Sequence, residues 1–82
     1  ETPAAGYPSR ARSKNIEGFV SVSLLIGIDG RVMDARVVEA HPEGVFEEAA
    51  LESVRQWRFS PAMYQGAPTS IRVTQKVEFK LS

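Results

Sequence analysis

The chain has 82 residues, no cysteine and a formal net charge of zero, with 10 Lys+Arg against 10 Asp+Glu. We therefore expect one small domain that is held together by packing, without disulfides, and we do not expect a nucleic-acid binder, which would need a strongly basic surface. No apolar run approaches the roughly 20 residues that cross a bilayer. Because the chain begins at Glu1, we expect any membrane anchor to lie upstream. The absence of cysteine leaves the compartment open.

The first residues fall into two parts. Residues 1–6 show no periodicity, which is typical of the end of a linker or a disordered lead, and one domain is expected over 7–82. The pair Tyr7-Pro8 predicts a short helix over Pro8–Lys14, because proline at a first helical position already has a helical φ. Its cations form either a solvated surface or a docking site: Arg10, Arg12 and Lys14.

Two strands joined by a tight turn are expected next. The first runs from Gly18 to Ile28 with every second residue apolar, and the second from Arg31 to Ala40. Between them, Asp29-Gly30 predicts a two-residue primed turn and therefore an antiparallel hairpin. The apolar positions of the second strand alternate less regularly, which predicts a bulge or a short pairing. The apolar parity of the first strand comprises Val20, Val22, Leu24, Ile26 and Ile28.

A helix is predicted from Val45 to Trp57, because apolar residues recur there at helical spacing. Its stripe consists of Phe46, Ala49, Ala50, Val54 and Trp57. The helix should end by Phe59, since Ser60 precedes Pro61 and is disfavoured in helical geometry. We interpret the aromatic pair at its end, Trp57 and Phe59, as part of the core. We predict that residues 62–69 form a loop into the last strand.

The last stretch, 70–81, alternates apolar and polar side chains and contains no proline, so it predicts a long strand with one buried face. The order of elements is short helix, strand, strand, helix, strand. This order favours an α+β fold in which two helices pack on one face of a three-stranded antiparallel sheet. The predicted core consists of Val22, Phe46, Ala50, Val54, Trp57, Phe59 and Phe79.

No constellation of residues predicts catalysis. The single histidine, His41, precedes a proline in a turn, so a loop histidine is the simpler interpretation than a base or a ligand. Without cysteine, a transition-metal site would need several carboxylates, and the glutamates of the expected helix occupy solvent positions. We therefore expect no enzyme, no cofactor and no metal. What remains is an edge of the predicted sheet, which can bind another strand.

Several motifs together resemble the TonB C-terminal domain family, and the resemblance runs from Tyr7 to Leu81. They are Tyr7-Pro8-Ser9-Arg10-Ala11, Ile16-Glu17-Gly18-Phe19-Val20-Ser21-Val22, Asp29-Gly30-Arg31-Val32, Phe46 with Ala49-Ala50-Leu51 and Val54, and Trp57-Arg58-Phe59-Ser60-Pro61-Ala62. Each motif is weak alone, but their order and spacing are specific together. The stretch from Met63 to Thr69 is longer and more apolar than in some members of the family.

The resemblance implies a Gram-negative periplasmic domain of a protein anchored in the inner membrane and partnered by the ExbB and ExbD motor proteins. Such a domain would bind the TonB box of outer-membrane transporters for siderophores, cobalamin or similar cargo, and would transmit force derived from the proton gradient. The implied contact is a strand added beside the last strand, with Arg10 near the transporter's plug or rim. The implied partner-binding residues are Arg10, Arg72, Val73, Thr74, Gln75, Lys76, Val77 and Glu78.

A second hypothesis assigns the same sheet edge a different function. A structural envelope module, or a homodimerisation module of the TolA-like kind, would pair this edge with a second copy of itself. The exposed cations beside the strand, at Arg72, Lys76 and Lys80, oppose such self-association. From the sequence alone, both hypotheses, peptide binding and self-association, remain open.

Overall fold

The computed structural model describes residues 6–81, so the expected lead, except Gly6, lies outside the described residues. The elements in chain order are α1 (Ser9–Ser13), β1 (Gly18–Ile26), β2 (Val32–His41), α2 (Glu47–Val54), β3 (Ala62–Tyr64), β4 (Ala67–Thr69) and β5 (Ile71–Phe79). In the described part of the chain, no helix has both the length and the apolar character needed to span a membrane.

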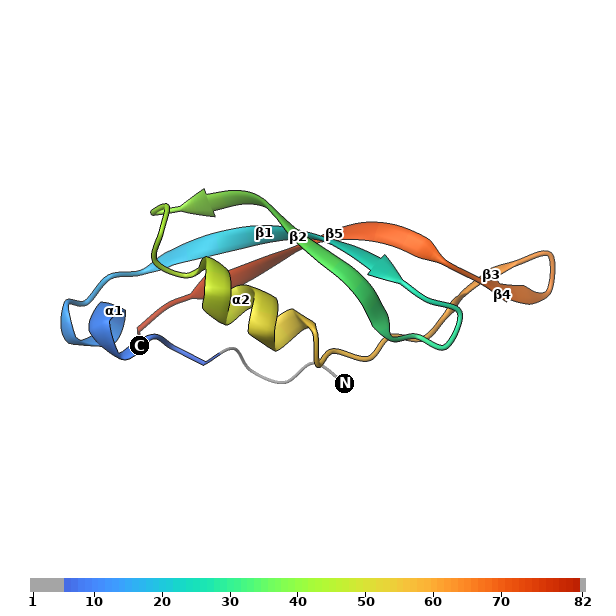
Figure 1. Cartoon of the computed structure of the whole chain (residues 1–82), viewed down its shortest axis with the longest axis horizontal. Coiled ribbons are helices and arrows are strands. Elements are labelled where there is room, and N and C mark those ends of the chain that lie inside the picture. Colours follow the sequence, from blue (N-terminus) through green and yellow to red (C-terminus); the bar gives the residue numbers. More distant parts are fainter. Residues whose placement is uncertain (1–5, 82) are drawn as a thin grey trace.

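The main sheet is antiparallel and has the strand order β2-β1-β5, with a separate two-stranded sheet formed by β3 and β4. Figure 1 shows α1 and α2 on the same side of the main sheet, while the β3–β4 hairpin extends beyond it at the opposite end from α1. The molecule is elongated, with extents of 49 × 21 × 17 Å. The predicted α+β fold, with an antiparallel sheet and two helices, is confirmed.

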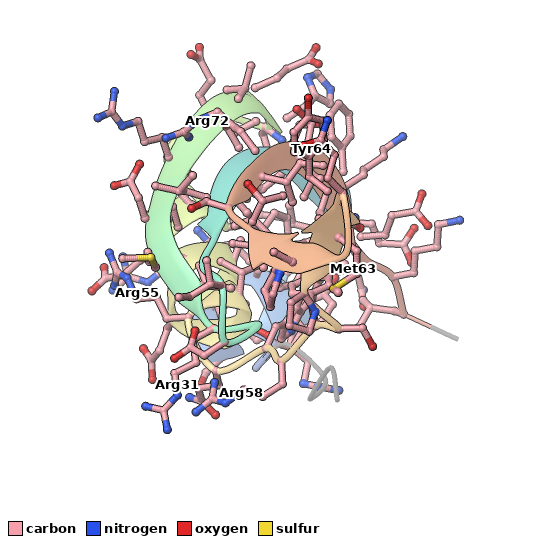
Figure 2. All side chains as sticks on the ribbon, turned by 90° about the vertical axis from the view of Figure 1, so that its right-hand side faces the viewer. Arg31, Arg55, Arg58, Met63, Tyr64 and Arg72 are labelled. Atoms are coloured by element: carbon pink, nitrogen blue, oxygen red, sulfur yellow. The ribbon has the colours of Figure 1, made fainter. Side chains whose placement is uncertain are left out.

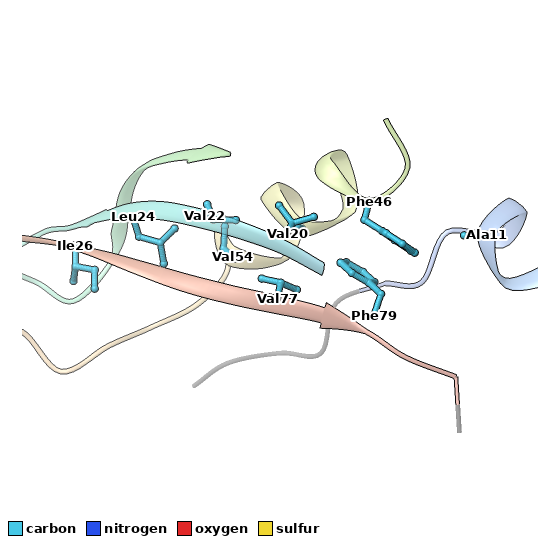
Figure 3. Close-up of a cluster of buried hydrophobic side chains, with 10 residues drawn as sticks. Ala11, Val20, Val22, Leu24, Ile26, Phe46, Val54, Val77 and Phe79 are labelled. Carbon is cyan, nitrogen blue, oxygen red and sulfur yellow. The ribbon is translucent and has the colours of Figure 1, made fainter. Parts of the chain in front are cut away.

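The core lies between the sheet and α2 (Figure 3). Alternate residues of β1 point into it, which is why the period of two in the sequence was informative. The aromatic rings of Phe46 and Phe79 stack at 4.4 Å between centroids, and Tyr7 packs edge-on against both. Among the residues expected in the core, Val22, Phe46, Ala50, Val54 and Phe79 are buried, whereas Trp57 and Phe59 are partly buried against them.

The second helix is shorter than its apolar pattern predicted. α2 ends at Val54, and the next turn is tightened, because the N–H groups of Gln56 and Trp57 donate to carbonyls three residues earlier, at 3.1 Å each. Such i to i−3 bonds are common where a helix terminates. Trp57 therefore lies beyond the helix and packs against the rim of the core.

The turn between β1 and β2 differs from the two-residue primed turn that was predicted. The N–H of Gly30 donates to the carbonyl of Gly27, and the N–H of Gly27 donates to the carbonyl of Arg31, so the connection is longer by a bulge. Among its residues only Gly30 has a positive φ, of 84°. The expected irregularity of the second strand is confirmed, because the β1–β2 register shifts at two places.

The prediction of a loop over 62–69 is wrong. These residues form a second hairpin, in which Tyr64 pairs with Ala67 across Gln65 and Gly66. Both turn residues have positive φ, at 50° and 82°, which is the geometry of a primed two-residue turn. The glycine between two short extended runs was the signal for it, and strands of three residues are too short for alternation to reveal.

Candidate functional site

The last strand has one paired edge and one unpaired edge. β5 pairs with β1 at nine consecutive positions, from Ile71 opposite Ile26 to Phe79 opposite Gly18, and the register does not shift. No strand of the described chain lies on its other side. We call this second side, along Ile71–Phe79, the open β5 edge. It presents backbone N–H and C=O groups at alternate residues in a regular array.

The other outer strand offers a less regular edge. β2 also has one side without a strand partner among residues 6–81, but its pairing with β1 shifts register between Ser21 and Val22 and again between Leu25 and Ile26. Bulges of this kind interrupt the array of backbone groups and twist an edge away from further pairing. Of the two outer edges, the open β5 edge is therefore the better template for an added strand.

The side chains of β5 fall on two faces. On the helix side, Val77 and Phe79 are buried and Val73 and Gln75 are half-buried, while Ile71 is 42% exposed. The other face is exposed and polar, and it carries Arg72, Thr74, Lys76 and Glu78. Since Val77 belongs to the core, only its backbone is available to a partner.

The side chain of Arg72 already contacts its own domain. Its guanidinium donates to Ser23 Oγ of β1 at 3.0 Å and lies 3.5 Å from a carboxylate oxygen of Asp34 on β2. Asp34 also accepts from Arg36 at 3.1 Å. This network connects all three strands of the main sheet on the face that carries no helix. This network could not be predicted from the sequence, because Arg72 is 49 residues from Ser23 and 38 from Asp34.

Lys76 likewise has intradomain contacts. Its ammonium group lies 4.5 Å from the ring centroid of Phe19 and 4.0 Å from a carboxylate oxygen of Glu78. A second ion pair of 3.9 Å joins Glu78 to Lys80. Both ion pairs join residues of β5 and the residue that follows it. They partly neutralise the charges beside the open β5 edge, but they do not connect β5 to another strand.

Arg10 lies far from Arg72, on α1. It is exposed and lines a cleft of about 220 Å³ together with Lys14, Ile16 and Val45. In Figure 1, α1 lies near the end of β5, whereas the β3–β4 hairpin lies near its start. The predicted residues of β5 thus follow one another along the open β5 edge with their side chains on two faces, and Arg10 lies beyond the opposite end of that strand from Arg72.

The end of β5 is fastened to the segment after α1. The N–H of Leu81 donates to a carboxylate oxygen of Glu17 at 2.7 Å. Nearby, the hydroxyl of Tyr7 donates to the carbonyl of Ile16. The pKa of Tyr7 is raised, mainly by burial and additionally by the charge of Glu17. Sequence reasoning missed the role of Glu17, because its partner is 64 residues away.

Residues 6–81 contain no group of three or more His, Cys, Asp or Glu side chains that could hold a metal ion. The open β5 edge offers a backbone array bordered by charged side chains. Such an array suits the binding of an extended peptide.

Comparison with known proteins identifies the family. The family model described as "Gram-negative bacterial TonB protein C-terminal" matches residues 3–81. "Protein TonB" of Vibrio cholerae is 31% identical over 75 residues, which cover 92% of this chain and 31% of that protein. "Protein TonB" of Pseudomonas aeruginosa is 33% identical over 75 residues, 92% of this chain and 22% of that protein. The chain thus spans less than a third of the length of these two relatives.

Solved structures agree with these matches. The solution structure of the Pseudomonas aeruginosa TonB CTD has a TM-score of 0.83 and 31% identity, covering 99% of this chain and 82% of that one. The TonB2 protein from Vibrio anguillarum gives a TM-score of 0.72 at 37% identity, covering 95% of this chain and 74% of that one. The resemblance seen in the sequence is confirmed: the chain belongs to the Gram-negative bacterial TonB protein C-terminal family.

Proposed function

We propose that the open β5 edge binds the TonB box of outer-membrane transporters by strand addition, and that the domain passes on force for active uptake. One observation carries this proposal: β5 is paired without a register shift over nine residues on one side, and no strand of the described chain covers its other side. Membership of the family supports the link to TonB-dependent transport.

The chemistry of the edge suits several partners. Backbone hydrogen bonds bind an extended segment with little demand on its sequence, so one domain can serve more than one transporter. Selectivity comes from side chains that alternate along the strand, and Thr74, Lys76 and Glu78 stand on the exposed face for that role. Arg10 contributes at a distance, as a charged contact with the body of the transporter.

The packing of the domain fits a role under load. A segment added to β5 lies parallel to the β1–β5 ladder, so a pull along the strand loads many backbone bonds together. Tyr7, which precedes α1 in the chain, packs against Phe79 at the end of β5, with ring centroids 5.8 Å apart. The chain that leads into the domain is therefore in contact with the strand that receives the partner.

The wider setting follows from the family and forms part of the proposal. We infer a periplasmic domain of a protein that is anchored in the inner membrane, driven by an ExbB and ExbD motor, and dedicated to cargo such as siderophores or cobalamin. In this role the domain is a binding and force-transmitting module with no catalytic step.

Proline substitution tests the assignment of the edge. Single prolines at Val73, Thr74, Gln75 and Lys76 remove one N–H each, and the N–H groups of alternate residues face β1 or the open side. At the outward positions we expect the domain to stay folded by circular dichroism while a TonB-box peptide binds at least tenfold more weakly in calorimetry. If every folded proline variant retains the peptide affinity of the parent domain, the open β5 edge is not the site.

The same edge also allows a homodimer, which is the alternative function. Sedimentation velocity over a range of protein concentrations, with and without peptide, separates the two. A monomer that binds peptide supports the transport proposal, whereas a concentration-dependent dimer without peptide affinity supports the dimerisation module. In a β5–β5 dimer that pairs antiparallel about Lys76, Lys76 would face its own counterpart and Arg72 would face Lys80, which disfavours that register.

A further inference from the structure

The backbone bonds of the β1–β2 turn determine which residues of β5 face the open β5 edge. The N–H of Gly27 donates to the carbonyl of Arg31 at 2.8 Å, so it points toward β2. Because the C=O and N–H of one trans peptide point in opposite directions, the carbonyl of Ile26 points toward β5, where Ile71 lies opposite it.

The rest of the β1–β5 ladder follows from this pair. Bonded pairs recur at every second residue of an antiparallel ladder, and this ladder has no register shift. The residues of β5 whose backbone groups bond to β1 are therefore Ile71, Val73, Gln75, Val77 and Phe79. Those whose backbone groups face the open β5 edge are Arg72, Thr74, Lys76 and Glu78.

In the β3–β4 hairpin, the same argument gives the direction of Pro68. Tyr64 and Ala67 flank the two-residue turn, so their backbone groups bond to each other. The next bonded pair is Ala62 with Thr69. Pro68 lies between the two pairs, so its nitrogen and its carbonyl point away from β3. Edge strands accept proline at such an outward position, because the missing N–H has no partner in the ladder.

β3 and β1 lie on the same side of the line formed by β4 and β5. Only Ser70 separates the two strands. Thr69, which faces β3, and Ile71, which faces β1, are two residues apart, and residues two apart in an extended chain point the same way. The outward side of β4 is therefore a continuation of the open β5 edge.

The path of the chain into the hairpin agrees with this placement. The N–H of Phe59 donates to the carbonyl of Gly30 at 2.9 Å, so the chain approaches β3 from the β1–β2 turn, which lies on the β1 side of β5. Figure 2 looks onto this end and shows Met63 and Tyr64 pointing to different sides of the hairpin, as consecutive residues of an extended strand do. The hairpin thus leaves the side on which Pro68 lies uncovered.

At Pro68 the array of backbone groups is interrupted. This residue is exposed, and no strand of residues 6–81 lies on the outward side of β4. A strand added there would find a carbonyl but no N–H, and the proline ring occupies the place to which an N–H would point. The outward positions from Ser70 to Glu78 contain no proline, so each of them offers both groups.

We propose that Pro68 is a positioning residue that ends the binding edge and so determines which part of an extended transporter segment pairs with the domain. This inference rests on the proposed function, strand addition to β5. The segment then pairs with 70–78, which span about 25–30 Å at about 3.3 Å per residue, and leaves the domain before the β3–β4 hairpin.

Hydrogen exchange of the free domain, followed by NMR, tests the direction of the backbone groups without any partner. We expect the odd-numbered amides of 71–77 to exchange at least about tenfold more slowly than the even-numbered amides of 72–78, because only the former are bonded to β1. Slower exchange at the even-numbered amides would overturn the assignment of the outward positions, and with it the role of Pro68.

Peptides of different length test the role of Pro68 in binding. The probes are a short TonB-box peptide and two versions of it, each lengthened at one end by further residues of the transporter. Pro68→Ala supplies the missing N–H, so it should bind one lengthened peptide about threefold to tenfold more tightly than the parent does, and the short peptide equally. The new amide at position 68 should become protected when that lengthened peptide binds.

Ser70→Pro and Ser70→Ala form a matched pair at the next outward position. Ser70→Pro moves the interruption closer to the centre of β5 and should weaken binding of the same lengthened peptide by about threefold to tenfold relative to the parent. Ser70→Ala keeps the N–H and should bind as the parent does. Circular dichroism verifies that each variant is folded.

Two results separate this inference from the proposed function. If the peptides protect the even-numbered amides of β5 but the parent and Pro68→Ala bind all of them equally, the role of Pro68 is wrong and strand addition stands. If no peptide protects an amide of β5 in either protein, strand addition is wrong, and the role of Pro68 falls with it.

Discussion

At the scale of single residues, the domain depends on a few aromatic contacts. Phe46 is fully buried, stacks on Phe79 and receives the edge of Tyr7, so it connects α2, β5 and the segment that enters α1. A chain of this size has little spare stability with which to compensate for the loss of such a ring.

We therefore expect Phe46→Ala to lower the free energy of unfolding by about 3–5 kcal/mol, because it removes a large side chain and leaves a cavity. Val38→Ala on the exposed face of β2 should change it by less than about 0.5 kcal/mol. Urea unfolding monitored by circular dichroism measures both. A Phe46→Ala domain as stable as the parent would show that the aromatic cluster is not central to the fold.

Glu47 at the start of α2 predicts a dependence of stability on pH. Its carboxylate accepts a hydrogen bond of 2.7 Å from the N–H of Gly44, and this bond, with others from nearby backbone N–H groups, lowers the pKa of Glu47. A lowered folded pKa contributes stability that is fully present above the unfolded value of about 4.3 and is lost as the pH falls through the folded value.

Glu47→Gln should therefore flatten the fall in the free energy of unfolding as the pH drops below about 5. The measurement is a series of urea titrations at successive pH values, with Glu48→Gln as the matched control on the neighbouring, exposed position. Parallel curves for the parent and Glu47→Gln would contradict the role of this carboxylate.

At the scale of elements, alternation in the sequence predicted β1 and β5, because each has one face on a small core, while the Asp29-Gly30 turn predicted β2 as the returning strand. The second hairpin was missed, because β3 and β4 have only three residues each and are mostly exposed. The pattern also could not show which edge of β5 is open, since that depends on where β1 and β2 pair. Nor could it reveal the contacts of Arg72 or Glu17, which join residues distant in the chain.

Two glycines with the same backbone geometry should differ sharply in their tolerance of alanine. Gly30 and Gly66 have φ of 84° and 82°, but a Cβ at Gly30 would lie 1.9 Å from the carbonyl oxygen of Phe59, whereas Gly66 has open space. We expect Gly66→Ala to cost about 1 kcal/mol from backbone strain, and Gly30→Ala clearly more, since the backbone must move. Thermal unfolding compares them, and equal costs would contradict the close approach of Phe59 to this turn.

Arg72 should hold the start of β5 against the other strands. Arg72→Ala removes contacts to β1 and β2, and because the group is exposed we expect a loss of at most about 1 kcal/mol in unfolding free energy. Amide hydrogen exchange around 71–74 should nevertheless be faster than in the parent. Lys80→Ala is the control, since its ion pair with Glu78 spans no other strand. Unchanged exchange in Arg72→Ala would show that the network does not fasten β5.

At the scale of the whole molecule, the elongated domain separates its surfaces. The helix α1, which contains Arg10, lies at one end, the exposed β3–β4 hairpin lies at the other, and the open β5 edge runs between them (Figure 1). A transporter segment bound along this edge, as we propose, would therefore run between α1 and the β3–β4 hairpin.

The central claim is that a transporter segment adds to β5, and amide protection tests it most directly. Hydrogen exchange followed by NMR, with and without a TonB-box peptide, should show new protection at alternate residues of 71–79 and little change along β2. Protection along β2 instead, or peptide binding with no protected amide in β5, would contradict the account.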